Sequence, residues 1–333
     1  MGKIFSSPVS PCPEKPLSKE EDKKTPVTLR ISVFFDGTGN NKFNTQERLN
    51  DSFIYNIIPK VIGDSYENDF SNVAKLYEGL DLTNASYDIN KKKYIQGIGT
   101  TAYIRDDETG VLTGAGLTGI MFAKDVLGFG RVNTALNEVV DKVSKNVNKV
   151  KQSISLLTID VFGFSRGAAA ARAFIYFALI DKEENIKRRL QIKEFTVGEV
   201  KVQFSGLFDT VAAFGIWNDD DTEDLHLDAI KASTQVVHLV AKDEYRGNFP
   251  LTDISSRQGL GKEILLPRAH SDIGGGYVNN MQEEDLILMH LPYAKEEARV
   301  GVNYHKKDKF VENIELLTNE KNRLVHEVYL LLN

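Results

Sequence analysis

A serine flanked by two glycines is the first feature of this sequence that could perform chemistry. Residues 163–167 read Gly-Phe-Ser-Arg-Gly, which gives Ser165 the G-x-S-x-G spacing. A serine in this pattern occupies a strained turn between a strand and a helix, where flanking side chains would collide with both elements. The pentapeptide predicts that Ser165 is a nucleophile for acyl transfer, although the same pattern also occurs in purely structural turns.

A serine hydroxyl attacks only when a base removes its proton, and an acid must hold that base in one tautomer. In proteins with this elbow the chain order is serine, then Asp or Glu, then His. Asp209 and His270 follow Ser165 in that order, so we predict them as acid and base. Asp209 could instead cap a helix, and His270 could be a turn histidine without a catalytic role. Asp272 is an alternative orienting acid.

The negative charge that develops during acyl transfer requires backbone N–H donors. The Arg166 N–H lies at the expected start of a helix, which favours such a role. A second donor is expected from the glycine-rich loop at residues 36–39, where Gly37 or Thr38 would supply it. These three residues are the candidate oxyanion hole.

The other histidines show no comparable pattern. His238 lies in the apolar run 236–241, which could be a helical or a strand face and where a packed histidine is expected. His226 lies among acidic residues. No cluster has a metal-site spacing such as H-E-x-x-H, so we expect neither a metal nor another cofactor. The histidines whose roles the pattern does not indicate are His290, His305 and His326.

Strands that end just before these candidates would bring them together. Apolar, β-branched runs predict strands, and an Ala-rich stretch after Ser165 predicts a helix packed closely on them. The expected strands are 28–35, 93–101, 154–162, 200–208 and 263–266, and the expected helices are 131–150 and 166–180, with 110–130 left unassigned. Alternation of strands and helices predicts an α/β fold with a mostly parallel, doubly wound sheet and helices on both faces, whose ligands bind at the carboxyl ends of the strands.

Composition narrows the class of protein. The 333 residues are 41% hydrophobic and 26% charged, which is typical of a soluble globular protein, and the net charge of −6 argues against a nucleic-acid partner. Cys12 is the single cysteine, so intrachain disulfides are excluded. The most apolar run, 168–180, is too short for a membrane span. We expect a flexible leader at 1–26, without a signal-peptide core, and one catalytic domain with insertions at 27–333.

Several motifs together resemble the type VI secretion phospholipase effectors of the first lipase class, a bacterial family whose catalytic domain was formerly of unknown function. They extend from the first expected strand to the tyrosine after His270. The matching segments are Phe34–Asn41, Tyr94–Thr100, Gly163–Ala168 with Ala171 and Arg172, Phe208–Val211, Asp243–Arg246 with Phe249 and Pro250, and His270–Tyr277.

The resemblance implies an α/β-hydrolase fold and hydrolysis of glycerophospholipid acyl esters by an antibacterial effector. It implies Ser165 as nucleophile, Asp209 as orienting acid and His270 as general base. It also implies synthesis in the bacterial cytoplasm, delivery by type VI spike proteins into the periplasm of a target cell, and a cognate immunity protein.

Two other functions stay open at this stage. The chain could be a soluble esterase or thioesterase for small acyl substrates, or a binding module with a vestigial elbow. The amphipathic segment 310–332 is expected to pack on the core rather than on a membrane.

Overall fold

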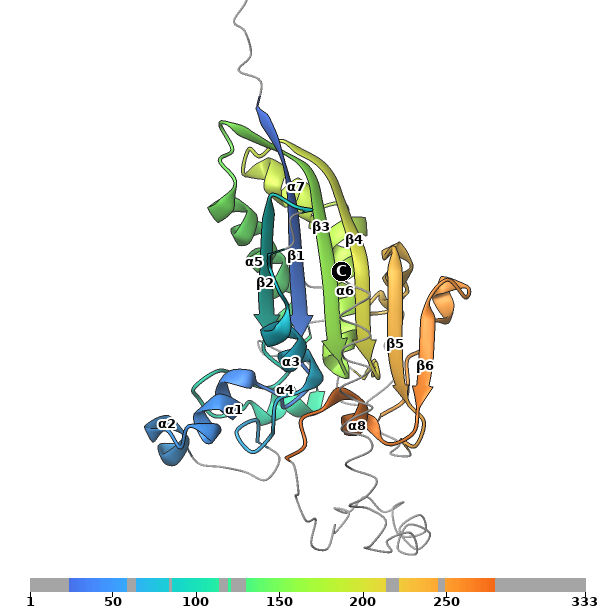
Figure 1. The fold of residues 1–333 in the computed structure, drawn as a ribbon. Coiled ribbons are helices and arrows are strands. Elements are labelled where there is room, and N and C mark those ends of the chain that lie inside the picture. Colours follow the sequence, from blue (N-terminus) through green and yellow to red (C-terminus); the bar gives the residue numbers. More distant parts are fainter. Residues whose placement is uncertain are drawn as a thin grey trace, which may run out of the picture.

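The computed structural model describes residues 24–58, 64–83, 86–113, 119–120, 130–213, 222–244 and 249–278. Within these ranges lies a six-stranded sheet in the order β2-β1-β3-β4-β5-β6, with every neighbouring pair parallel (Figure 1). The strands are β1 (Thr25–Phe35), β2 (Ile89–Ile95), β3 (Gln152–Phe164), β4 (Val197–Phe208), β5 (Gln235–Ala241) and β6 (Lys262–Leu266).

Helices pack on both faces of the sheet. The main core forms against α5, α6 and α7, and includes Leu29, Ile31, Leu157 and Ile159 from β1 and β3. Because successive strand residues face opposite sides, Phe34 and Phe162 belong to a second cluster on the other face, against α3 and α8. The helices are α1 (Lys42–Leu49), α2 (Phe53–Ile57), α3 (Asn72–Gly79), α4 (Glu108–Thr113), α5 (Arg131–Asn146), α6 (Arg166–Ile175), α7 (Ile186–Ile192) and α8 (His270–Gly274), and shorter helical turns are η1 (Tyr176–Ile180), η2 (Leu227–Ala232) and η3 (Ser255–Arg257).

This arrangement confirms the predicted fold class. A mostly parallel sheet with helices on both faces is present, and β1, β3, β4, β6 and α5 overlap the ranges that the sequence pattern predicted, with ends that differ by up to four residues. All six strands run in the same direction. The loops after β1, β3 and β4 and helix α8 therefore lie at the same end of the sheet (Figure 1).

Several expected boundaries differ from the structure. The strand expected at 93–101 is β2 at Ile89–Ile95, because the glycines that follow belong to a hydrogen-bonded turn in which the Gly97 N–H binds the Asn40 carbonyl. The helix expected at 166–180 is α-helical to Ile175 and continues as the π-helical turn η1. The run 236–241 is strand β5. Strand β1 begins at Thr25, within the segment 1–26 expected as a leader.

Several segments with a sequence-based prediction lie outside the described residues. They are Cys12, most of the expected leader at 1–26, and the segment 310–332. None of the helices in the described ranges has the length and apolarity that a membrane crossing requires.

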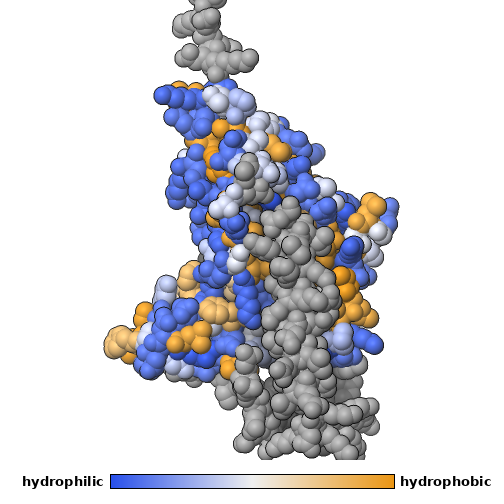
Figure 2. Space-filling view, viewed as in Figure 1, coloured by the Kyte–Doolittle hydropathy of each residue, from blue (hydrophilic) through white to orange (hydrophobic). Residues whose placement is uncertain are grey.

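Apolar side chains are exposed on α1 and α2, at the end of the molecule where the strands finish (Figures 1 and 2). Phe53 and Ile57, one helical turn apart on α2, are 77% and 59% exposed, and Leu49 at the end of α1 is 51% exposed. We call these three residues the α1–α2 apolar surface.

The central strand β3 makes a prediction about stability. Ile159 is fully buried in the main core, so Ile159→Ala leaves a cavity and is expected to lower the free energy of unfolding by about 2–5 kcal/mol, against about 0.5–1.5 kcal/mol for Ile159→Val. Urea denaturation measures both values. The control is Val150→Ala, at a position that is 71% exposed, with an expected change within about 0.5 kcal/mol. Equal effects of the two alanine variants would contradict this description of the core.

Candidate active site

Ser165 occupies a tight turn between β3 and α6. Its backbone has φ 57° and ψ −132°, a conformation that costs a non-glycine residue on the order of 1–3 kcal/mol. The Ser165 N–H donates to the Phe208 carbonyl at 3.0 Å, and the Ser165 carbonyl accepts from the Ala168 N–H at 2.9 Å. Hydrogen bonds to the neighbouring strand and to the following helix therefore hold the strained turn in place.

The two flanking glycines are required by close backbone contacts. A Cβ added at Gly163 would lie 2.5 Å from the Cα of Ala168 in α6. A Cβ at Gly167 would lie 2.1 Å from the carbonyl oxygen of Asp36, just after β1. The prediction that side chains at these positions would collide with strand and helix is confirmed.

Asp209 and His270 form a buried pair, and each is 3% exposed. The Nδ1 of His270 lies 2.6 Å from Oδ2 of Asp209. Asp209 follows β4 in the left-handed region with φ 40°, and its N–H donates to the Leu239 carbonyl at 2.7 Å. Its Oδ1 accepts from the Ala241 N–H at 2.9 Å. Strand β5 thus fixes the carboxylate that faces the imidazole.

The structure also distinguishes Asp209 from Asp272 as the acid that contacts His270, and tests whether Asp209 caps a helix. Asp272 is exposed, and its Oδ2 accepts from the Ala269 N–H at 3.2 Å at the start of its own helix. Residues 210–213 form no helix that Asp209 could cap, and Val211 pairs with Leu251 as an isolated antiparallel bridge. Of the two candidate acids, Asp209 is the one in contact with His270.

Phe164, the residue before the serine, packs against His270. The Phe164 ring lies 4.7 Å from the imidazole, centroid to centroid. An added Cβ at Gly37 would approach the same ring to 2.3 Å, and one at Gly274 to 1.9 Å, so the ring is enclosed by the loop after β1 and by α8. Both Ser165 and His270 lie in the described ranges, and no hydrogen bond joins the Ser165 hydroxyl to His270. Ser165 is connected to the pair through its chain neighbours: it follows Phe164, and its N–H donates to Phe208, the residue before Asp209.

The loop after β1 contains two of the predicted oxyanion donors. The Gly37 N–H donates to Oδ1 of Asp36 at 2.8 Å. The Thr38 hydroxyl accepts from Nε of Arg166 at 2.9 Å, which ties this loop to the helix after the serine. Burial raises the pKa of Asp36 to about 6, although hydrogen bonds from Ser71, Tyr94 and the Gly37 N–H oppose the shift.

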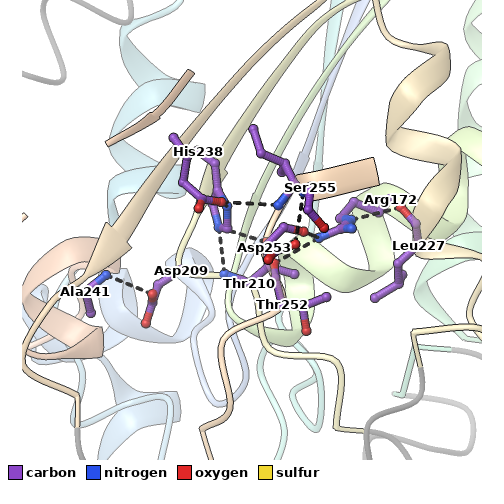
Figure 3. Close-up of polar contacts among 11 residues, drawn as sticks. Arg172, Asp209, Thr210, Leu227, His238, Ala241, Thr252, Asp253 and Ser255 are labelled. Carbon is purple, nitrogen blue, oxygen red and sulfur yellow. Dashed lines mark hydrogen bonds and ion pairs between the residues drawn. The ribbon is translucent and has the colours of Figure 1, made fainter. Parts of the chain in front are cut away.

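A second polar network adjoins Thr210, the residue that follows Asp209 (Figure 3). Arg172 of α6 is buried and donates to the carbonyls of Leu227, Thr252 and Asp253 at 2.9–3.0 Å. His238 is fully buried in β5, as expected for a packed histidine, but both its ring nitrogens also have polar partners in Thr210 and Glu263.

Sequence reasoning did not find these supporting contacts. Phe164, Asp36, His238 and Glu263 carry no local signal of their roles, because each partner comes from a different strand or loop. Burial of a histidine requires partners for its nitrogens, and only the β5–β6 pairing identifies Glu263 as one of them. No group of three or more His, Cys, Asp or Glu side chains in the described ranges could hold a metal ion.

An elbow that joins a central parallel strand to a helix, with candidate polar groups at the strand ends, defines the α/β-hydrolase-like class. The chain belongs to the family described as "T6SS, Phospholipase effector Tle1-like, catalytic domain", whose model matches residues 29–183 and 176–296. The predicted resemblance is confirmed. A search of curated proteins gave no match.

Two solved structures are similar to this chain. One is the Tle1 effector bound to the VgrG spike of the type 6 secretion system, which has 28% sequence identity and a TM-score of 0.47 over 77% of this chain and 52% of that one. The other is an uncharacterized protein from Pseudomonas aeruginosa, with 21% identity and a TM-score of 0.48 over 75% of this chain and 42% of that one. The chain thus spans about half the length of these two proteins or less.

Asp36 makes the stability depend on pH. Its pKa is raised from 3.8 to about 6 in the fold, so the folded state holds a proton that the unfolded state has released between these values. Its contribution to stability is full below pH 3.8 and is lost as the pH rises through about 6. An asparagine side chain has no proton to release in this range, so Asp36→Asn should not lose stability as the pH rises. Its amide oxygen can still accept the Gly37 N–H.

We therefore expect the free energy of unfolding of Asp36→Asn to rise relative to wild type between pH 4 and pH 7, by up to about 3 kcal/mol. Urea denaturation of both proteins at each pH measures the difference. A difference that stays constant over this range would show that Asp36 does not titrate there.

Proposed function

We propose that this chain is a serine hydrolase that cleaves the acyl esters of glycerophospholipids, an activity of phospholipase A type, as an antibacterial effector. The observation that carries the proposal is the buried Asp209–His270 hydrogen bond beside the Ser165 elbow. Membership of a phospholipase effector family supports the choice of a lipid substrate.

In the proposed mechanism Ser165 attacks the ester carbonyl while His270 accepts its proton. The Nδ1–H of His270 donates to Asp209, which leaves Nε2 free as the base. The imidazolium that forms returns the proton to the leaving alcohol, and water then releases the acyl group by the same route. The absence of a hydrogen bond between the Ser165 hydroxyl and His270 is compatible with this role, because catalytic hydrogen bonds often shorten only when substrate binds.

Two backbone N–H groups would hold the oxyanion. The Arg166 N–H at the start of α6 is the first donor, because helix N-termini favour negative charge. For the second donor we favour Thr38 over Gly37, since the Gly37 N–H already donates to Asp36. The hydrogen bond from the Arg166 side chain to Thr38 supports a fixed distance between the two donors.

The location of exposed apolar side chains supports a lipid substrate. The α1–α2 apolar surface lies at the end of the molecule where the strands finish (Figure 1). Ser165 directly follows strand β3, at its carboxyl end. Apolar side chains at this end could contact a phospholipid surface while one lipid reaches the serine.

The family description also supports a route of delivery. We propose export by a type VI secretion system through a spike protein, action in the periplasm of the target cell, and a cognate immunity protein in the producing cell. The family name supports the secretion route, and the immunity protein follows from the need of the producer to protect lipids that it shares with its target.

The nucleophile is tested by Ser165→Ala. We expect hydrolysis to fall by roughly 10⁴-fold to 10⁶-fold while the melting temperature changes little, because the substitution removes one oxygen. Ser153→Ala, at the opposite end of β3, is the matched control and should keep wild-type activity. A fluorophosphonate probe should label Ser165 in the wild type. Full turnover by folded Ser165→Ala would exclude this mechanism.

The substrate class is tested by comparing phospholipid vesicles with short-chain nitrophenyl esters and thioesters. We expect the larger kcat/KM on phospholipid and release of fatty acid and lysophospholipid, identified by mass spectrometry. Higher kcat/KM on the soluble esters would favour a small-molecule esterase or thioesterase. Failure of both hydrolysis and probe labelling would favour a binding module.

A further inference from the structure

A second histidine–carboxylate pair, His238 and Glu263, contacts the residue that follows the candidate acid. His238 of β5 is fully buried, and its neighbours Val237 and Leu239 are apolar. Its Nδ1 lies 2.9 Å from Oε2 of Glu263 on the adjacent strand β6. Its Nε2 lies 3.1 Å from both the backbone nitrogen and the hydroxyl of Thr210, the residue that follows Asp209 (Figure 3).

These contacts define the protonation of the imidazole. A backbone N–H can only donate, so Nε2 of His238 must present its lone pair to Thr210. The single proton of the neutral ring then lies on Nδ1, where it donates to the Glu263 carboxylate. The same carboxylate accepts from the Ile254 N–H at 3.2 Å, and the hydrogen bond with His238 is the largest cause that lowers the pKa of Glu263.

Thr210 is therefore held at both of its backbone polar groups. His238 accepts its N–H, and the Thr252 N–H donates to its carbonyl at 2.9 Å. The Thr252 carbonyl in turn accepts from Arg172 of α6, the helix that follows Ser165 (Figure 3). An apolar residue in place of His238 would leave the buried Thr210 N–H without an acceptor, which costs about 1–3 kcal/mol.

Asp209 lies directly before this anchored residue in a left-handed conformation. Three positions of β5 hold the turn: Leu239 accepts the Asp209 N–H, Ala241 donates to its Oδ1, and His238 accepts the Thr210 N–H. A release of Thr210 would let the peptide after Asp209 rotate, which would move Oδ2 away from the Nδ1 of His270. A displacement of about 1 Å at such a position can cost 10²-fold in rate.

We propose that His238, held in one tautomer by Glu263, is a positioning residue that presents Asp209 to His270. This inference rests on the proposed function for its kinetic consequence. The geometric consequence, the Asp209–His270 hydrogen bond, can be observed whether or not Ser165 is the nucleophile.

The tautomer is tested first, in the wild-type protein. In a sample with ¹⁵N-labelled histidine, assigned with His238→Gln as reference, we expect His238 to carry its proton on Nδ1 and a lone pair on Nε2. A proton on Nε2 would overturn the proposal, since that nitrogen could no longer accept the Thr210 N–H.

Two variants of His238 separate its two hydrogen bonds. A Gln side chain can place an oxygen near the position of Nε2 and so keep an acceptor for Thr210, whereas Asn reaches only the position of Nδ1. We expect His238→Asn to lower kcat about 10-fold to 100-fold with KM nearly unchanged. His238→Gln should stay within about fivefold of the wild-type kcat. Equal kcat values for wild type and folded His238→Asn would overturn the proposal.

A double-mutant cycle tests whether His238 acts through Asp209. The loss caused by His238→Asn should shrink to less than about twofold when Asp209 is already Asn. The same loss in both backgrounds would show that His238 serves the fold in general, and would overturn the proposal.

Magnetic resonance gives a readout that does not depend on the reaction. The proton between His270 and Asp209 should resonate far downfield in the wild type and in His238→Gln, and should be lost in His238→Asn. Its persistence in His238→Asn would overturn the inference. An active Ser165→Ala would contradict the proposed function instead, and would leave this resonance as the test of the positioning role.

Glu263→Gln gives a variant at a partly exposed position that should fold even if His238→Asn does not. The amide is uncharged and can either donate or accept, so its hydrogen bond to Nδ1 is weaker and holds the tautomer of His238 less firmly than the carboxylate does. We expect kcat to fall several-fold with KM unchanged, together with a weaker downfield proton. A wild-type kcat and resonance in Glu263→Gln would show that the carboxylate has no part in positioning Asp209.

Discussion

The conformation of one residue, Asp209 at the end of β4, determines whether this chain contains a usable histidine–carboxylate pair. A non-glycine residue in the left-handed region is unfavourable unless its surroundings fix it there. Strand β5 supplies those contacts through the Leu239 carbonyl, the Ala241 N–H and the imidazole of His238. The geometry of the site is therefore built by the strand next to β4, which contributes none of the three candidate catalytic side chains.

The parallel sheet and one aromatic ring bring the remaining groups together. Because all six strands run the same way, the chain leaves β1, β3 and β4 at the same end, and α8 returns to that end after β6. The ring of Phe164 fills the space between the loop at Gly37 and the helix at Gly274, and contacts His270. The strained turn at Ser165, the loop with the predicted oxyanion donors and helix α8 with His270 are therefore packed around one side chain.

Much of the fold and the candidate site could be predicted from the sequence where the signal is local. Near Ser165 the sequence indicates a strand from the apolar run, a helix from the Ala-rich run, and a tight turn from the two glycines. The structure contains this strand, turn and helix. The residue pattern predicted the wrong bounds for the strand at 93–101, because the glycines after a short strand form a turn. It also could not distinguish strand from helix at 236–241. In both segments the backbone conformation follows from pairing with distant residues.

The sequence by itself determined the candidate set: a serine in an elbow, an acid and a histidine in the order expected for this class, and a family resemblance that the comparison confirmed. Only the tertiary structure decided that Asp209 rather than Asp272 contacts His270, that the Gly37 N–H is already engaged by Asp36, and that His238 has Glu263 and Thr210 as partners. The physical reason is that residue types and spacing reflect local sterics, whereas the partner of a buried polar atom depends on which strands lie side by side.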